Sequence, residues 1–77
     1  MPKLIKQLSA KDSSTRNKAA YALAGYGADA KPATRALIAR LKDPNMGVRS
    51  TAAYALRSIG TPEATKALDA YEKDRAP

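Results

Sequence analysis

Apolar residues recur at three- and four-residue intervals along most of the chain, which is the spacing of helices that bury one face. On a helix over residues 12–26, one arc holds Thr15, Ala19, Ala22, Leu23 and Tyr26. On a helix over residues 45–59, the corresponding arc holds Val48, Ala52, Ala55, Leu56 and Ile59. We expect these two arcs to form the core. Ala20 and Ala53 flank the arcs, where a small side chain lets neighbouring helices approach closely.

Residues that start and end helices divide the chain into predicted elements. Asp12, Asn45 and Thr61 are suitable N-cap residues, and Gly27 and Gly60 stand where a left-handed glycine closes a helix. The predicted helices cover roughly residues 2–9, 12–26, 31–42, 45–59 and 62–73. The sequence therefore predicts an all-α protein whose five helices pack in two layers.

The second half of the chain repeats the first. A shift of 33 residues superposes the run AAYAL at 19–23 on the same run at 52–56, and Arg16 on Arg49. Repetition at roughly 20–50 residues is typical of stacked supersecondary units, none of which buries its apolar face alone. We therefore predict a short α-solenoid of about two helix pairs.

The helix faces opposite the two core arcs are expected to meet solvent. At about 100° per residue, the first face holds Asn17, Tyr21 and Ala24. The second face holds Ser50, Tyr54 and Arg57. An exposed tyrosine is a large contact residue with little side-chain entropy to lose, so Tyr21 and Tyr54 are candidate contacts, although they could instead only shield neighbouring helices. Tyr26 and Tyr71 lie on core arcs and are expected to be structural.

Composition excludes most enzyme mechanisms. The 77 residues contain neither Cys nor His, which supply the commonest metal ligands, nucleophiles and proton carriers near neutral pH. We therefore expect no catalytic residue, no metal and no cofactor. No apolar stretch suits a signal peptide or a membrane span, so we expect a soluble, cytoplasmic protein that binds no membrane.

Positive charge is concentrated in the first part of the chain. The net charge is +7, with +8 over residues 1–60 and −1 over residues 61–77. A solvated surface, recognition of an acidic protein and binding of nucleic acid all fit this excess. Only Lys18 and Arg57 share the face of Tyr21 and Tyr54, and we expect a denser basic stripe in a nucleic-acid binder. An acidic protein partner is therefore favoured, with nucleic acid as the alternative.

One stretch carries the pattern of a known repeat. The segment LIARLKDPNMGVRSTAAYALRSIG, residues 37–60, holds four linked elements, namely Asp43-Pro44, Val48-Arg49, AAYAL and Gly60. Together they resemble the short HEAT-like repeat, including the form seen in phycobilin lyase subunits. The first copy departs from this pattern, with Ala10 at the position of the turn aspartate and Thr15 in place of valine. We expect Asp12 to replace the missing acid.

The resemblance implies a single HEAT-like repeat domain over residues 1–77. Repeat one covers about residues 3–27, repeat two about 33–60, and a C-terminal capping helix about 62–74. It also implies that Arg49 ties the turn through a charge-assisted bond to Asp43.

The resemblance further implies a non-catalytic module for protein–protein interaction. In this family, the second helix of each pair lines a concave surface whose variable positions are the usual contacts. The predicted partner-binding residues are Asn17, Lys18, Tyr21, Ala24, Ser50, Thr51, Tyr54 and Arg57. Enzymatic relatives rely on His-Glu pairs for iron or on a groove tryptophan, and this sequence contains neither His nor Trp.

The number of helix pairs is small for a stacked array, which usually needs three or more units. The chain is expected to be either a minimal free-standing module or a fragment of a longer array. Self-association through the end helices is a third possibility, because it would extend a thin core.

Overall fold

The computed structural model describes residues 2–75, so residues 1 and 76–77 of the expected domain lie outside the described residues. Within the described part, the secondary structure is helical, with no strand. The elements are α1 (Pro2–Gln7), α2 (Ser13–Tyr26), the 3₁₀ helix η1 (Gly27–Ala33), α3 (Thr34–Arg40), α4 (Met46–Ile59) and α5 (Pro62–Arg75).

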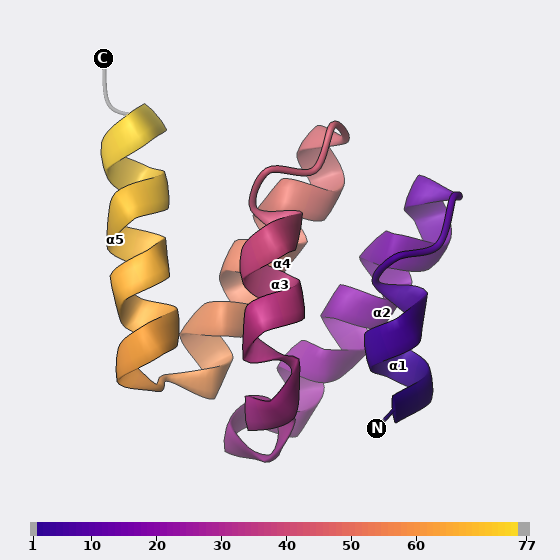
Figure 1. Cartoon of the computed structure of the whole chain (residues 1–77), viewed down its shortest axis with the longest axis horizontal. Helices are drawn as coiled ribbons and strands as arrows, with labels where there is room; N and C mark the ends of the chain where they lie inside the picture. Colours follow the sequence, from indigo (N-terminus) through magenta and orange to yellow (C-terminus); the bar gives the residue numbers. More distant parts are fainter. Residues whose placement is uncertain (1, 76–77) are drawn as a thin grey trace.

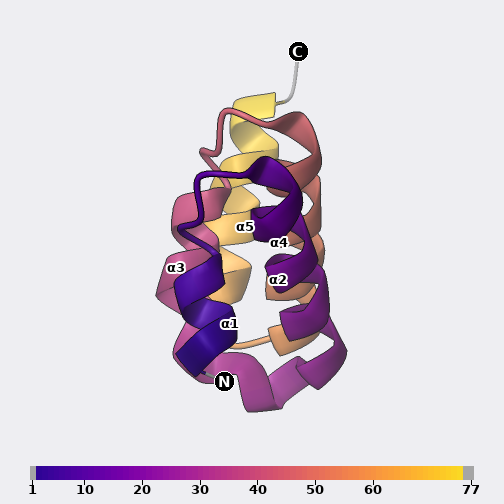
Figure 2. The same ribbon diagram turned by 90° about the vertical axis from the view of Figure 1, so that its right-hand side faces the viewer.

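The most extensive contact between two helices joins α2 and α4, which lie side by side (Figure 1). Viewed along the stack, α1 and α3 lie on one side and α2 and α4 on the other (Figure 2). Helix α4 is the central element, since it packs against α2, α3, η1 and α5. The stack therefore begins at the α1/α2 pair and ends at α5.

The predicted caps of the long helices are confirmed. The carboxylate of Asp12 accepts the backbone N–H of Thr15 at 3.1 Å, and Asn45 Oδ1 accepts the N–H of Val48 at 3.1 Å. Gly60 has the left-handed conformation expected of a residue that ends a helix, with φ 69° and ψ 15°.

The link between the two repeats differs from the prediction. Gly27 has a positive φ of 55°, but its ψ of −131° lies outside the left-handed region. The chain then forms η1 instead of a loop, and the helix predicted from residue 31 becomes α-helical only at Thr34. Ala30 and Ala33 are fully buried, so this short helix closes one end of the core.

The predicted core is correct for α4 and partly wrong for α2. All five residues of the α4 arc are buried. On α2, Ala22 and Tyr26 are exposed, although Ala55 and Ile59 at the equivalent positions of α4 are buried. Helix α4 lies between α2 and α5, whereas α2 has a long neighbour on one side only. The buried face of α2 is therefore turned toward α4.

The residues of α2 that are buried in place of Ala22 and Tyr26 are small. Ala20 and Ala24 of α2 are buried, and Ala53 occupies the position equivalent to Ala20 on α4. Short side chains at these positions let α2 and α4 approach closely. Tyr71 is half-buried and packs against the core, as expected from its arc.

Candidate interaction surface

Two tyrosines meet on the solvent-exposed face of α2 and α4. The ring centroids of Tyr21 and Tyr54 are 6.3 Å apart and the ring planes are inclined by 61°, which is an edge-to-face contact. Pairs of this kind contribute about 0.5–1.5 kcal/mol beyond the burial of their area. Both residues stay largely exposed, Tyr21 at 64% and Tyr54 at 52%. We call this pair the tyrosine ridge.

Shallow depressions lie on both sides of Tyr21. One, of about 330 Å³, is lined by Tyr21, Ser50, Thr51 and Tyr54. The other, of about 370 Å³, is lined by Lys18, Tyr21, Ala22 and Gly25. Ala22 and Gly25 were not among the predicted contact residues, since Ala22 was expected in the core; a Cβ at Gly25 would meet nothing within 4 Å. Tyr21 thus stands between two hollows that a partner's side chains can enter, and Tyr54 lines one of them.

Charged and polar predicted residues surround the ridge. Lys18 and Ser50 are exposed, whereas Thr51 is half-buried and its hydroxyl donates to the carbonyl of Gly47 at 3.0 Å. Arg57 Nη2 lies 3.6 Å from Glu72 Oε2 of α5, in an exposed ion pair. Because Glu72 offsets the charge of Arg57, Lys18 is the main cation beside the ridge.

Two predicted contact residues lie elsewhere. Ala24 is only 7% exposed, because the face of α2 that carries it is turned toward α4, so the expectation that it meets solvent is wrong. Asn17 is half-buried, and its Oδ1 is buried without a hydrogen-bond partner within residues 2–75. The surface available to a partner is therefore narrower than the helical wheel indicated.

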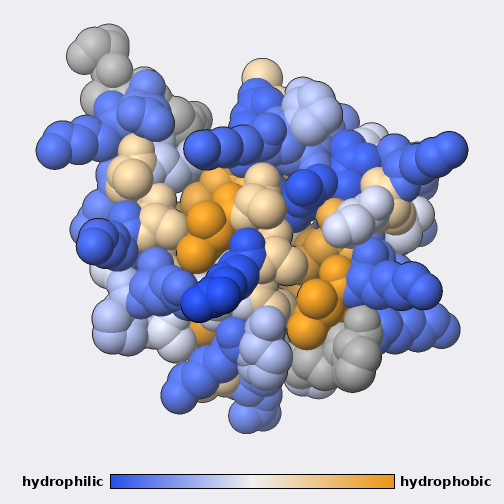
Figure 3. Space-filling view, in the orientation of Figure 1, coloured by the Kyte–Doolittle hydropathy of each residue, from blue (hydrophilic) through white to orange (hydrophobic). Residues whose placement is uncertain are grey.

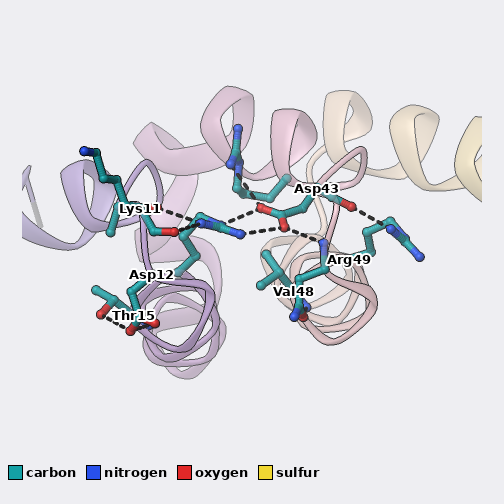
Figure 4. Close-up of polar contacts among 10 residues, drawn as sticks. Lys11, Asp12, Thr15, Asp43, Val48 and Arg49 are labelled. Carbon is teal, nitrogen blue, oxygen red and sulfur yellow. Dashed lines mark hydrogen bonds and ion pairs between the residues drawn. The ribbon is translucent and has the colours of Figure 1, made fainter.

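Arg16 and Asp43 join the first turn of α2 to the turn before α4, and Figure 4 shows the polar contacts around Asp43. Arg16 donates to the two carboxylate oxygens of Asp43, from Nε at 2.7 Å and from Nη2 at 3.0 Å. Its Nη1 donates to the carbonyl oxygens of Ala10 and Lys11, each at 2.8 Å. One guanidinium thus connects the turn before α2 with the turn before α4. We call these contacts of Arg16 the bracket, and they tie the start of α2 to the turn before α4.

The carboxylate of Asp43 accepts four hydrogen bonds, as many as the guanidinium of Arg16 donates. Its carboxylate also accepts Arg40 Nη1 at 3.1 Å and the backbone N–H of Asn45 at 2.9 Å. Burial raises the pKa of Asp43, but the hydrogen bonds from Arg16 and Asn45 and the charges of Arg16 and Arg40 outweigh burial and lower the pKa below its ordinary value. Asp43 therefore stays ionised inside the fold.

The structure corrects two expectations about these turns. Arg49 does not bond to the carboxylate of Asp43; its Nη1 donates to the carbonyl oxygen of that residue at 2.6 Å. Asp12 does not serve as the acid of Arg16, since its carboxylate accepts the N–H and hydroxyl of Thr15. The Thr15 hydroxyl bond is the main cause of the lowered pKa of Asp12. The acid that serves Arg16 comes from the other repeat, because the helix packing brings Asp43 across to it.

The described residues contain no group of three or more acidic side chains arranged to hold a metal ion. Within the same part of the chain, no helix is long and apolar enough to cross a membrane. What this face offers a ligand is aromatic area, shallow hollows and one lysine.

The chain is similar to one known family of repeat proteins. A family model described as HEAT repeats matches residues 1–77. No curated protein and no solved structure matches the chain significantly.

Proposed function

The chain belongs to the HEAT-repeat family, and on that premise we propose that it is a non-catalytic binding module that engages another protein through the tyrosine ridge. HEAT repeats generally serve as scaffolds for protein interactions. In this proposal, α2 and α4 are the second helices of two repeats, at about residues 3–27 and 33–60, in a two-layered stack. Helix α5 caps the stack, and the concave face of the repeat helices receives the partner.

The observation that carries the proposal is the exposure of two adjacent aromatic rings. Tyr21 and Tyr54 are more than half exposed, yet each already restricts the other through the edge-to-face contact. A partner that covers them gains a large contact area and immobilises few additional rotatable bonds. Aromatic residues of this kind carry most of the binding energy at many interfaces.

An acidic partner is part of the proposal. Lys18 is exposed beside Tyr21 and lines the same hollow. The excess positive charge over residues 1–60 attracts acidic surfaces over a distance of about 10 Å at moderate salt. These features favour fast association with an acidic protein more than they add to the final affinity.

The test begins with purification of the tagged full chain from its source cell and identification of the proteins that come with it. The affinity of the recovered partner is then measured for the wild type, for Tyr21→Ala plus Tyr54→Ala, and for Tyr26→Ala. Tyr26 is a matched control, because it is 51% exposed on the same helix as Tyr21 but takes no part in the ring pair. We expect the double variant to lose about tenfold or more in affinity and the control to stay within about twofold. Equal affinities for the double variant and the wild type would refute the proposal.

Nucleic acid is the alternative ligand and needs a separate measurement. Titration of duplex DNA and of RNA at two salt concentrations distinguishes the two classes, because phosphate contacts give an affinity that falls steeply with salt. Tight, salt-sensitive binding of either duplex would replace the protein-partner proposal. Absence of binding at low salt would eliminate the alternative.

A further inference from the structure

Arg16 and Arg49 occupy equivalent positions, but only Arg16 is bonded to a carboxylate. Arg16 holds the carbonyl oxygens of its own turn and reaches forward to the carboxylate of Asp43 in the next repeat. Arg49 occupies the equivalent position of the second repeat and holds its own turn through the carbonyl oxygen of Asp43. Among residues 2–75, however, no carboxylate forms an ion pair with Arg49. Arg49 therefore lacks the counterpart of the contact that Arg16 makes with the carboxylate of Asp43.

The reason lies in the course of α5. Helix α3 ends at Arg40, and the turn that follows brings Asp43 to Arg16. Helix α5 follows α4 as α3 follows α2, but it continues to Arg75 without such a turn. No turn after α5 therefore brings an aspartate to Arg49 within residues 2–75, although the guanidinium of Arg49 has the same donor groups as that of Arg16.

Arg49 is one of the residues that line a groove on the surface. In Figure 4, Lys11 and Arg49 lie on opposite sides of Asp43. The groove has a volume of about 460 Å³ and runs between α3 and α5, so we call it the α3–α5 groove. Its apolar wall includes Ile38, Leu41 and Tyr71. Figure 3 shows apolar surface between these two helices, with hydrophilic side chains around it.

Charge at the groove has a definite pattern. Lys42 and Arg49 line it together with a single acid, Asp74. Two cations beside an apolar wall suit a carboxylate carried on an apolar segment, because the guanidinium binds carboxylates in bidentate fashion. Lys42 and Arg49 with Asp74 leave the groove a net charge of +1 (two cations minus one acid), which suits a single carboxylate better than a polyanion such as nucleic acid.

We propose that the α3–α5 groove binds an acidic segment of a protein partner. An aspartate or glutamate of that segment accepts hydrogen bonds from Arg49, as Asp43 accepts them from Arg16. Apolar side chains next to that carboxylate rest against Ile38 and Leu41. This site shares no residue with the tyrosine ridge, so the two proposals stand or fall separately.

Asp43 of a second copy does not supply this carboxylate. Asp43 of each copy is already occupied by Arg16, Arg40 and the N–H of Asn45. A copy stacked end to end would present the turn before its own α2, where Ala10 stands at the position equivalent to Asp43. With Asp43 committed and alanine at the equivalent position, we assign the acid to a segment of a different protein.

A pair of synthetic peptides tests the proposal on the full chain. The probe is an acetylated and amidated peptide with the sequence LIAQLQDPNM, which is residues 37–46 with glutamine in place of Arg40 and Lys42 and a single carboxylate. The control peptide, LIAQLQNPNM, has asparagine in place of that aspartate. Titration followed by amide chemical shifts locates the binding and measures the affinity. We expect the probe to shift amides around Arg49 and Tyr71 and to bind about tenfold more tightly than the control.

Variants of the protein test whether the probe binds at the α3–α5 groove and not at the tyrosine ridge. Arg49→Gln should weaken the probe about tenfold, while Arg49→Lys keeps the charge without the fork and should lose less. Asp74→Asn should tighten binding about twofold by removing a like charge. Tyr21→Ala plus Tyr54→Ala should leave the affinity within about twofold, which distinguishes failure at this groove from failure at the ridge.

Several outcomes would overturn the proposal. These are equal affinities for the two peptides, no binding of the probe at millimolar concentration, or unchanged binding by Arg49→Gln. A dimer in sedimentation analysis that Arg49→Gln dissociates would assign the groove to a second copy instead. If Arg49→Gln fails to fold by circular dichroism, the comparison of the two peptides on the wild type decides.

Discussion

Asp43→Asn tests the central role of the bracket, because it keeps the shape of the side chain and removes its charge. In the native protein, the carboxylate accepts two hydrogen bonds from Arg16, one from Arg40 and one from the backbone of Asn45. The side chain of Asp43 is fully buried, and Arg16 is only 8% exposed. The variant therefore leaves a buried guanidinium without its counter-charge and turns one amide N–H₂ group toward it.

The expected loss of stability is about 3 kcal/mol. Removing one partner of a buried ion pair costs about 3–5 kcal/mol. The lower end applies because the Cα trace extends only 16 Å along its shortest axis, so water lies close to the pair. At about 0.05–0.15 kcal/mol per residue, a chain of this length has a total free energy of unfolding of roughly 4–12 kcal/mol. The substitution therefore removes a quarter or more of the stability.

The lowered pKa of Asp43 gives the loss a characteristic pH dependence. A carboxyl group whose native pKa is depressed stabilises the fold fully above its unfolded pKa, and this contribution disappears as the pH falls through the native pKa. The ordinary value for aspartate is 3.8. The difference in unfolding free energy between the wild type and Asp43→Asn should be full at neutral pH and shrink below about pH 4.

Urea unfolding followed by circular dichroism, at several values between about pH 7 and pH 2.5, measures both quantities. Asp69→Asn is the control, since Asp69 is an exposed carboxylate on α5, and we expect it to change the free energy of unfolding by less than about 0.5 kcal/mol. The reasoning fails if Asp43→Asn is as stable as that control at neutral pH. It also fails if the difference from the wild type stays constant as the pH falls.

Two further predictions concern glycines and the core. Gly25→Ala should stabilise the protein by about 1 kcal/mol, because Gly25 lies inside α2 and a Cβ there meets nothing within 4 Å. Gly60→Ala should destabilise it by a similar amount, because Gly60 has a φ of +69°. Thermal unfolding of the matched pair checks the signs, and two shifts in the same direction would contradict the argument. Leu56→Ala, at a fully buried position of the central helix, should cost about 3 kcal/mol in urea unfolding, and a loss below about 1 kcal/mol would mean that α4 is not the centre of the core.

Much of the fold could be predicted because its signals are local. The caps Asp12, Asn45 and Thr61 bond to backbone groups three residues away, so the sequence contains both partners. The same holds for Gly60, whose left-handed conformation ends α4. The link through η1 was not predictable in this way, since Ala30 and Ala33 are buried only because the core lies against them.

The candidate surface was predictable in part. The repeat of AAYAL placed Tyr21 and Tyr54 at equivalent positions, and both are exposed as expected. Their function in binding remains a prediction. Ala24 was assigned to the same surface because a helical wheel shows only which residues share a face. Which side of that face another helix covers depends on packing between distant segments.

The sequence alone determined what short-range physics decides, namely the helices, most of their ends, the internal repeat and the position of the tyrosines. Only the tertiary structure decided which carboxylate serves which arginine. Arg16 and Arg49 occupy equivalent positions and both lie near Asp43, yet one takes the carboxylate and the other the carbonyl oxygen. That choice depends on how α2 packs against α4, and it is also what leaves Arg49 with its remaining donors beside an apolar groove.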